Sequence, residues 1–167
     1  MSYRETDIET YELKPFEAIG KQWTLISAQK DGVVNTMTAS WGGIGVLWSK
    51  NVMTVYVRPQ RYTREFIDAS DYFTVTLFGG HLKELGVLGS KSGRDGDKIA
   101  EVGFHVETVA GQPTFAEGKT AIVCKKLYRG RLQPENFVTD AIVDSCYPKK
   151  DFHYVYVGEI VGIFENE

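Results

Sequence analysis

Alternation of apolar residues with a period of two runs through most of the chain and constrains its fold more than any other feature. The clearest case is the run from His153 to Phe164, where glycines and aromatic residues share one face and aliphatic residues dominate the other. A strand this long, with glycines on one face, is typical of a bent barrel strand. The same pattern predicts strands at Gln22–Ala28, Val33–Ser40, Val52–Arg58, Tyr72–Phe78, Thr120–Leu132 and Phe137–Asp144.

Helical patterns are few and short, and they fall between Arg61 and Gly103. Two or three helices are predicted there: Tyr62–Ala69, His81–Leu88, and one that begins near Asp95 and ends at Gly103. The tract Glu107–Gly118 is predicted to be a connecting loop. Because seven or eight strands do not alternate regularly with helices, we expect a mainly β fold, an antiparallel barrel, in one domain over residues 1–167.

Charge and composition exclude several classes of protein. The 167 residues carry 19 basic and 22 acidic side chains, a formal net charge of -3, which argues against a nucleic-acid-binding protein. No signal peptide and no apolar run of about 18 residues is found, so no membrane association is expected. The two cysteines form no C-x-x-C pair and the histidines have no metal-binding spacing. We therefore expect a soluble, cytoplasmic protein without a metal.

The first candidate site is a strand of small and hydroxyl side chains that runs into a glycine-rich turn at Gly42–Gly45. Its residues are Thr36, Met37, Thr38, Ala39, Ser40 and Trp41. Small side chains let a flat ligand lie against the backbone, whose N–H groups can donate to ring acceptors. The alternative is a tight connection between strands, in which Trp41 and Trp48 only fill the core.

The second candidate site is basic and lies where a strand ends and a short helix begins. Arg58, Arg61 and the hydroxyl of Thr63 gather there, beside Tyr62. Guanidinium groups and free N–H groups at a helix start attract anions such as a phosphate monoester. The alternative is a solvated basic turn in which Thr63 caps the helix. A ring platform and an anion site on neighbouring strands together describe a nucleotide-like ligand.

Two weaker candidates lie further along the chain. The stretch Gly89–Asp95 offers Lys91 and Ser92, which can close over the same phosphate, although such a stretch is more often a polar surface loop. His153 opens the last strand, where it is either a site residue at the barrel mouth or a structural histidine. No phosphate loop, dinucleotide fingerprint or hydrolase nucleophile elbow is present.

Four segments in register resemble the flavin reductase-like family, and its flavoredoxin branch in particular, over about residues 14–165. They are Thr36–Trp41, Tyr56–Pro59 leading into Arg61–Thr63, Ser92–Asp95 with Asp97–Lys98, and Tyr156–Ile160. The resemblance implies a Greek-key split β-barrel with a tightly but non-covalently bound FMN. It also implies a homodimer with FMN near the subunit interface.

The resemblance also implies positions for the cofactor. Residues 36–41 would line the isoalloxazine ring and the ribityl chain, largely through backbone groups. The phosphate end would lie among Arg58, Arg61, Tyr62 and Thr63. Lys91 and Ser92 would approach the cofactor from their loop, and His153 from the start of the last strand.

Three functions are compatible with this sequence. The first is an NAD(P)H-dependent flavin reductase that passes electrons to free flavin, oxygen or a redox partner. The second is an FMN electron carrier of the flavoredoxin type, without a productive nicotinamide site. The third is a split-barrel binding module for another ligand. No catalytic side chain is assigned, because a flavin itself accepts hydride and the protein need only hold, shield and tune it.

Overall fold

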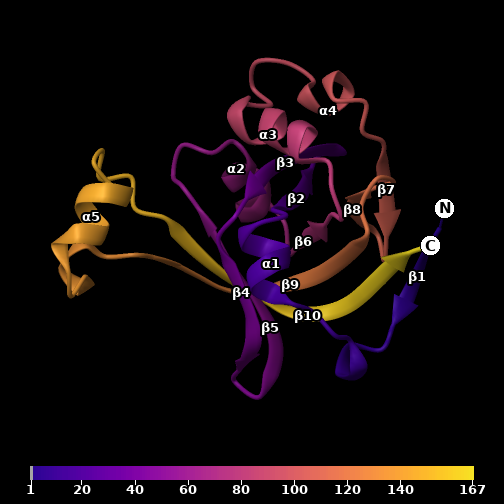
Figure 1. Cartoon of the computed structure of the whole chain (residues 1–167), viewed down its shortest axis with the longest axis horizontal. Helices are drawn as coiled ribbons and strands as arrows, with labels where there is room; N and C mark the ends of the chain where they lie inside the picture. Colours follow the sequence, from indigo (N-terminus) through magenta and orange to yellow (C-terminus); the bar gives the residue numbers. More distant parts are fainter. Residues whose placement is uncertain (1) are drawn as a thin grey trace.

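The computed structural model describes residues 2–167 and is built on one antiparallel sheet of eight strands (Figure 1). The order of the strands is β3-β2-β6-β9-β10-β5-β4, and β1 pairs with the far end of β10. The mainly β, antiparallel prediction is confirmed. The bounds are β1 (Tyr3–Thr6), β2 (Thr24–Lys30), β3 (Val33–Ala39), β4 (Gly42–Leu47), β5 (Lys50–Val57), β6 (Tyr72–Leu77), β9 (Thr120–Arg131) and β10 (Tyr154–Asn166).

The connection between β3 and β4 requires the sheet to curl. These strands occupy opposite ends of the strand order, and a flat sheet would separate them by roughly 29 Å at about 4.8 Å per strand. Only Ser40 and Trp41 join them, and three Cα–Cα steps span at most about 11 Å. The two outer strands therefore approach each other at Ser40–Trp41, as expected for a split barrel.

Strand β10 is bent, as its glycines predicted. Its pairing with β9 shifts register between Val157 and Gly158 and again between Ile160 and Gly162. At Gly158 an added Cβ would lie 2.7 Å from the Cβ of Cys124 and 2.8 Å from the ring of Phe73. The core on that side therefore packs directly against the backbone of β10, which needs glycine at this position.

Three apolar clusters fill the molecule, and the smallest of them contains Val109, Ala121 and Val123. The largest one lies between the strands and α2 (Thr63–Ala69), and its largest fully buried side chains are Ile26, Met53, Ile67, Phe73, Ile122, Tyr156 and Ile163. The second one is covered by α3 (Leu82–Ser90) and α4 (Lys98–Glu101), and it contains Leu25, Phe78, Leu85, Leu88, Phe104 and Phe115. The helices α3 and α4 thus seat the segment between them against the outer strand β3.

The three predicted helices between Arg61 and Gly103 are confirmed, although α4 begins later than expected. The carboxylate of Asp97, not Asp95, accepts from the amide of Ala100 at 3.0 Å and begins α4. Gly103, with φ of 73°, follows the end of this helix as predicted. Two further helices lie outside that stretch: α1 (Pro15–Gly20) and α5 (Asp140–Cys146).

The loop prediction for residues 107–118 is wrong. This tract contains most of a hairpin of β7 (Val106–Val109) and β8 (Gln112–Phe115). Ala110 and Gly111 form its two-residue turn with φ of 48° and 75°. Two successive positive φ angles match the right-handed twist of the flanking strands, which explains how a turn without Asn-Gly closes the hairpin.

The strand prediction for Phe137–Asp144 is also wrong. Residues 132–153 form a projection, here called the arm, which leaves the sheet after β9 and returns at β10 (Figure 1). It holds a short 3-10 helix (Pro134–Asn136) and α5, which begins where the hydroxyl of Thr139 accepts from the amide of Ala141. The arm belongs to no strand of the sheet, and hydrogen bonds within its two short helices satisfy part of its backbone.

The glycine-rich segment 42–45 was predicted to be a turn and is a strand instead. It forms most of β4, which pairs with β5 in a hairpin that projects from the body (Figure 1). The turn lies at Trp48 and Ser49, each with φ of 54°. No helix in residues 2–167 combines the length and apolar character needed to cross a membrane.

Candidate functional site

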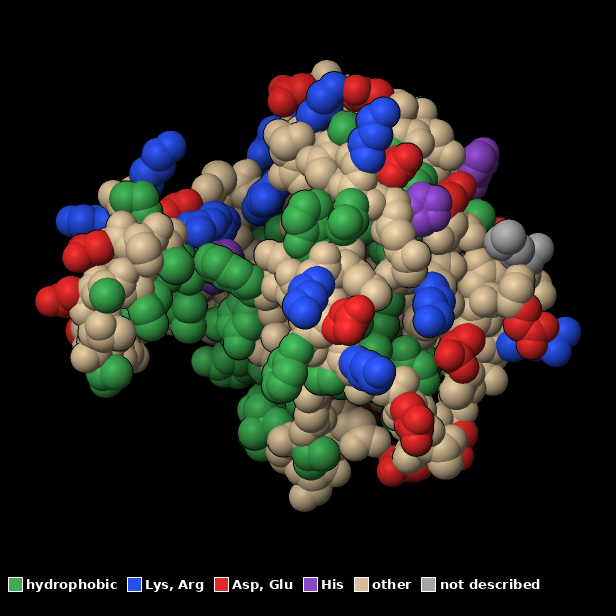
Figure 2. All heavy atoms as spheres, in the orientation of Figure 1, with side chains coloured by type: hydrophobic (Ala, Val, Ile, Leu, Met, Phe, Trp, Pro, Cys, Tyr) green, Lys and Arg blue, Asp and Glu red, His purple; other side chains and the backbone are tan. Residues whose placement is uncertain are grey.

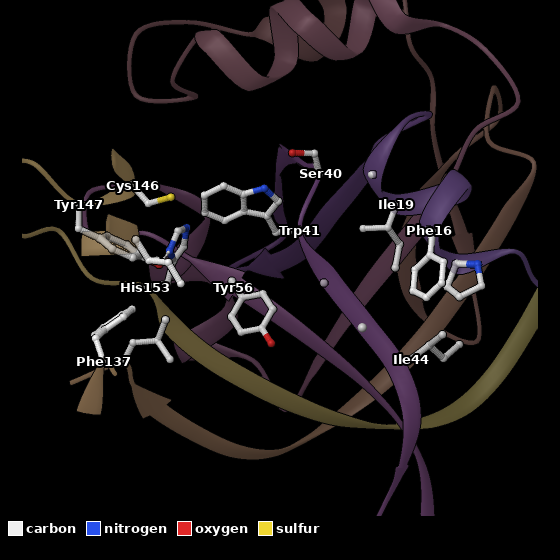
Figure 3. Close-up of a pocket in the computed structure, with 16 residues that line it drawn as sticks. Phe16, Ile19, Ser40, Trp41, Ile44, Tyr56, Phe137, Cys146, Tyr147 and His153 are labelled. Atoms are coloured by element: carbon white, nitrogen blue, oxygen red, sulfur yellow. Dashed lines mark hydrogen bonds between the residues drawn. The ribbon is translucent and has the colours of Figure 1, made fainter. Parts of the chain in front are cut away.

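A cleft of about 670 Å³, here called the apolar cleft, separates the arm from the body of the molecule. In Figure 2 hydrophobic side chains gather where the arm meets the body, and Figure 3 shows the arm residues facing Trp41 and Tyr56, with Phe16 and Ile19 beyond them. Strand β4 forms the floor, and no atom lies within 4 Å of where a Cβ of Gly43 would be. Its side-chain walls include Phe16, Ile19, Trp41, Ile44, Tyr56, Phe137, Ile142, Cys146, Tyr147 and His153.

A smaller cavity of about 200 Å³, here called the middle cavity, opens from this cleft along β3. It shares Ser40, Trp41, Tyr56 and His153 with the apolar cleft and adds Met37, Thr38, Ala39, Arg58 and Arg61. Because β3 ends the strand order, one edge of its backbone has no neighbouring strand. The segment chosen from the sequence as a ring platform therefore offers backbone groups at this edge.

A third hollow of about 310 Å³, here called the basic cavity, continues from the middle cavity. The two share Arg58 and Arg61, and the remaining lining residues are Gln60, Tyr62, Ser90, Lys91 and Ser92. The three spaces thus form a series that runs from aromatic to cationic walls. An elongated molecule with a flat apolar end and an anionic end matches this order.

Arg58 connects the site to the arm. Its Nη1 lies 3.1 Å from a carboxylate oxygen of Asp151, and its Nη2 donates to the carbonyl of Cys146 at 3.0 Å. Its guanidinium also lies 5.1 Å from the ring centre of Tyr147. A hydrogen bond from Gln60, together with Arg58, holds the pKa of Asp151 below its usual value. The charge of Arg58 is therefore already balanced by a carboxylate.

Arg61 and Lys98 carry positive charges that no carboxylate balances. Neither has an Asp or Glu oxygen within 4 Å among residues 2–167, and the Lys98 residue is only 5% exposed. Burial, and then the charge of Arg58, lower the pKa of Arg61. Burial, and then the charge of Arg61, lower the pKa of Lys98 to about 8. Unbalanced buried charges destabilise the folded protein unless an anion binds beside them.

His153 is a neutral, buried group at the junction of the apolar cleft and the middle cavity. Burial and Arg58 lower its pKa to about 4, so the imidazole is uncharged at neutral pH. Its Nδ1 lies 2.6 Å from the hydroxyl of Tyr147, and its ring centre lies 5.3 Å from that of Trp41. Nε2 has no hydrogen bond to any described residue, which leaves it available to a ligand.

Two predicted site hydroxyls are engaged elsewhere. The hydroxyl of Thr36 lies 2.8 Å from that of Ser27 and bonds to the carbonyl of Ile26, and the residue is fully buried. The hydroxyl of Thr63 accepts from the side chain of Asn35 at 2.8 Å, and the residue is 1% exposed. Neither residue lines any of the three spaces, so these hydroxyls stabilise the walls rather than contribute to them.

The segment 89–93 reaches the basic cavity through a tightly packed turn. An added Cβ at Gly89 would lie 2.9 Å from the Cβ of Thr38, and one at Gly93 would lie 2.2 Å from the amide oxygen of Asn35. The ammonium of Lys91 pairs with Glu101, while the amide N–H of Ser92 has no acceptor among the described residues. Ser92 is therefore the better anion donor of the two predicted residues.

The sequence did not identify several walls of the site. Phe16 belongs to α1, and Phe137, Ile142 and Tyr147 belong to the arm. Lys98 begins α4 and lines none of the three spaces, but it binds the carbonyl of Lys91 in the wall of the basic cavity. No spacing relates these segments to residues 36–63, because only the tertiary fold brings them together. Residues 2–167 contain no cluster of three or more His, Cys, Asp or Glu side chains that would hold a metal.

Comparison with known families identifies the class of this protein. The family model described as the flavin reductase-like domain matches residues 16–167. The chain therefore belongs to the flavin reductase-like family. A search of curated proteins finds no match.

Solved structures agree with this assignment. An FMN-binding domain of a flavin reductase-like enzyme from Shewanella baltica OS155 is 21% identical, with a TM-score of 0.70 over 99% of this chain and 78% of that one. A flavoredoxin from Methanosarcina acetivorans is 25% identical, with a TM-score of 0.66 over 87% and 69% of the two chains. A Shewanella frigidimarina NCIMB 400 protein, described as having a split barrel domain, is 15% identical, with a TM-score of 0.68 over 97% and 76%. The split-barrel prediction is confirmed.

Proposed function

We propose that this chain binds FMN non-covalently, with the phosphate in the basic cavity, the ribityl chain in the middle cavity and the isoalloxazine ring in the apolar cleft. The observation that carries the proposal is a pair of cations for which the described residues supply no carboxylate: Arg61, which lines the basic cavity, and Lys98, which binds the carbonyl of Lys91 in the cavity wall. A phosphate dianion would balance both charges. A neighbour at 21% identity is described as an FMN-binding domain, which supports the same cofactor.

The walls of the apolar cleft fit a flat heteroaromatic ring. The open side of Gly43 and the rings of Trp41 and Tyr56 provide apolar contact, and the free edge of β3 provides backbone donors and acceptors. The hydroxyl of Tyr147, which burial keeps protonated by raising its pKa, lies 2.6 Å from Nδ1 of His153, and we assign the hydroxyl as the donor. That assignment puts the imidazole proton on Nε2, as a neutral donor toward a ring acceptor.

We further propose that the chain is an NAD(P)H-dependent flavin reductase. Bound FMN would supply hydride acceptance from a nicotinamide and release of electrons to free flavin, oxygen or a redox partner. The residues of the chain would hold the ring, exclude water from one face and place a neutral donor beside it. Family membership supports an oxidoreductase, and the cleft, at about 670 Å³, leaves space beside the ring for a second flat molecule.

Steady-state oxidation of NADH and NADPH, each with added FMN, tests the reductase. We expect turnover well above the background of free flavin with at least one nucleotide. Background rates with both nucleotides, from a protein that binds FMN, would contradict the reductase and leave FMN binding intact.

An electron carrier of the flavoredoxin type is the second candidate, supported by the similarity to the Methanosarcina acetivorans flavoredoxin. In that case a ferredoxin would reduce the bound flavin rapidly, whereas neither nicotinamide would. Anaerobic mixing of the loaded protein with reduced ferredoxin, NADH or NADPH, followed by flavin absorbance, distinguishes the two functions.

We also propose that two copies of the chain associate through the face that bears the apolar cleft. Phe16, Val46, Trp48 and Ile142 are 91%, 74%, 53% and 47% exposed around it, on α1, the tip of the β4–β5 hairpin and the arm. Exposed apolar patches of this kind mark interaction surfaces, and a second copy is the simplest partner. Sedimentation of the FMN-loaded protein should give a dimer.

The location of the chain in the cytoplasm stays a prediction, which cell fractionation would test.

A further inference from the structure

Lys98 lies at the start of α4, where it is buried and has no carboxylate partner among the described residues. Its ammonium donates to the carbonyl of Leu88 at 2.7 Å and to the carbonyl of Lys91 at 2.9 Å. It therefore binds backbone carbonyls on both sides of the turn that ends α3. A lysine within a polar segment would ordinarily extend into water, so this inward position needs an explanation.

A second cation acts on the same turn. Nη1 of Arg61 donates to the carbonyl of Gly89 at 2.6 Å, between the two carbonyls that Lys98 binds. Cations at the carboxyl end of a helix are favoured by its dipole and by its unpaired carbonyl groups. Arg61 and Lys98 thus shape the segment from Gly89 to Ser92, three of whose residues line the basic cavity.

We propose that Lys98 is a positioning residue for the phosphate of FMN: it fixes the segment from Gly89 to Ser92 around the basic cavity and adds positive charge behind it. This inference rests on the proposed function. Lys98 does not line the basic cavity, so it acts through the Ser90–Ser92 backbone and through its field rather than by contact. Its two carbonyl acceptors leave its charge unbalanced until an anion binds.

The charges around Lys98 make this role measurable by pH. Burial lowers the pKa of Lys98 most, and the positive charge of Arg61 lowers it further. The other charged groups nearby have partners of their own: Lys91 pairs with Glu101, and the carboxylate of Asp97 caps α4. With a pKa of about 8, Lys98 is roughly three-quarters neutral at pH 8.5 in the unliganded protein. A phosphate dianion would raise that pKa, so FMN binding at pH 8.5 should take up a proton.

The first experiment compares FMN with riboflavin, which lacks the phosphate, by quenching of flavin fluorescence. Lys98→Met should weaken FMN binding by about 10- to 50-fold and riboflavin binding by less than about 2-fold. Lys98→Arg keeps the charge and should restore most of the FMN affinity. A merely structural lysine would weaken the binding of both flavins equally.

Lys126 provides a matched control. Its ammonium donates to the carbonyls of Ile67 and Asp68 at 2.7 and 3.2 Å, the same chemistry at the end of α2, but the segment that it binds lines none of the three spaces. Lys126→Met should lower the unfolding temperature and leave the ratio of FMN to riboflavin affinity unchanged. The ratio therefore separates a phosphate effect from a general loss of stability.

The second experiment measures proton uptake on FMN binding to the wild-type protein, by calorimetry at pH 8.5 in two buffers of different ionisation enthalpy. Uptake of up to about three-quarters of a proton is expected, and it should be absent in Lys98→Arg. This measurement decides the question even if Lys98→Met does not fold. Tight FMN binding without proton uptake, or an equal loss for both flavins, would overturn the role of Lys98 alone. A wild-type protein that binds neither flavin would overturn the proposed function as well.

Discussion

The apolar cleft and the basic cavity lie at opposite ends of one series of spaces, but they are built differently. The cleft has walls from α1, β4 and the arm, and several of its apolar side chains, such as Phe16, Trp41 and Ile142, are exposed. The walls of the basic cavity are held by hydrogen bonds that Arg61 and Lys98 donate to backbone carbonyls. The comparison indicates that the anion end is preorganised and selective, whereas the ring end is adaptable and open to further partners.

Removal of Arg61 should have the largest effect of these changes, and the effect should be confined to the anion end. Arg61→Ala should weaken FMN binding by about 2–3 kcal/mol, roughly 30- to 150-fold, because a charged hydrogen bond to phosphate is lost. Riboflavin binding should change by less than about 2-fold. Arg94→Ala is the control, because Arg94 lies nearby over the ring of Tyr62 but lines none of the spaces. An equal loss for both flavins would place the phosphate elsewhere.

Acid should destabilise the junction of the two ends through His153. Burial and Arg58 hold its pKa at about 4 in the folded protein, against an ordinary value of 6.5, so between these two pH values the unfolded chain binds a proton that the folded chain does not. Stability should therefore fall as the pH drops from 6.5 to 4, by about 2 kcal/mol from this group. Denaturant unfolding of wild type and His153→Gln tests this, and a variant with the same pH dependence as wild type would contradict it.

Loss of Arg58 should affect both ends, because it links the basic cavity to the arm. Arg58→Ala removes the ion pair with Asp151 and the bond to the Cys146 carbonyl. We expect FMN binding to weaken by about 1.5–2 kcal/mol and riboflavin binding by about 1 kcal/mol. Asp151→Asn, which breaks only the ion pair, should have a smaller effect. An effect of Arg58→Ala on FMN alone would show that the arm does not depend on this residue.

A side chain on the floor of the cleft should produce the smallest effect. Gly43→Val adds atoms where the fold has open space, and the φ of Gly43 suits any residue. FMN and riboflavin binding should weaken together by about 1 kcal/mol, since the added methyl groups occupy part of the ring site. Gly45→Val, on the same strand but outside the cleft lining, is the control. Unchanged affinities in the Gly43 variant would place the ring away from β4.

The sequence predicted those parts of the fold whose signal is local. Strands such as β5 and β10 alternate along their own length, and Gly103 follows the end of α4, where a C-terminal glycine was predicted. The arm was misjudged because its apolar Val138 and Ile142 resemble half of a strand pattern but remain exposed. The β7–β8 hairpin was missed because Pro113 and Gly111 are typical of loops, although Pro113 occupies an outer strand that tolerates it.

In the candidate site too, some residues were predicted from the sequence and others were not. Residues 37–41, Arg58, Arg61 and His153 line one cavity, although β3 is not a neighbour of β5 or β10 in the sheet, because the curl of the sheet brings these strands together. The hydroxyls of Thr36 and Thr63 face inward instead, since their neighbours Ser27 and Asn35 offer hydrogen bonds in the core. Asp97–Lys98 contributed to the family resemblance, but no role was predicted for Lys98, because its role depends on the carbonyls of Leu88 and Lys91 that only the folded chain brings within reach.

The most direct test of the account is a titration of the unliganded wild-type protein with FMN and with riboflavin, followed by flavin fluorescence at neutral pH. The account predicts that both are quenched and that FMN binds at least about 30-fold more tightly, since only FMN reaches Arg61 and the charge of Lys98. Equal affinity for the two, or no quenching by FMN, would contradict it.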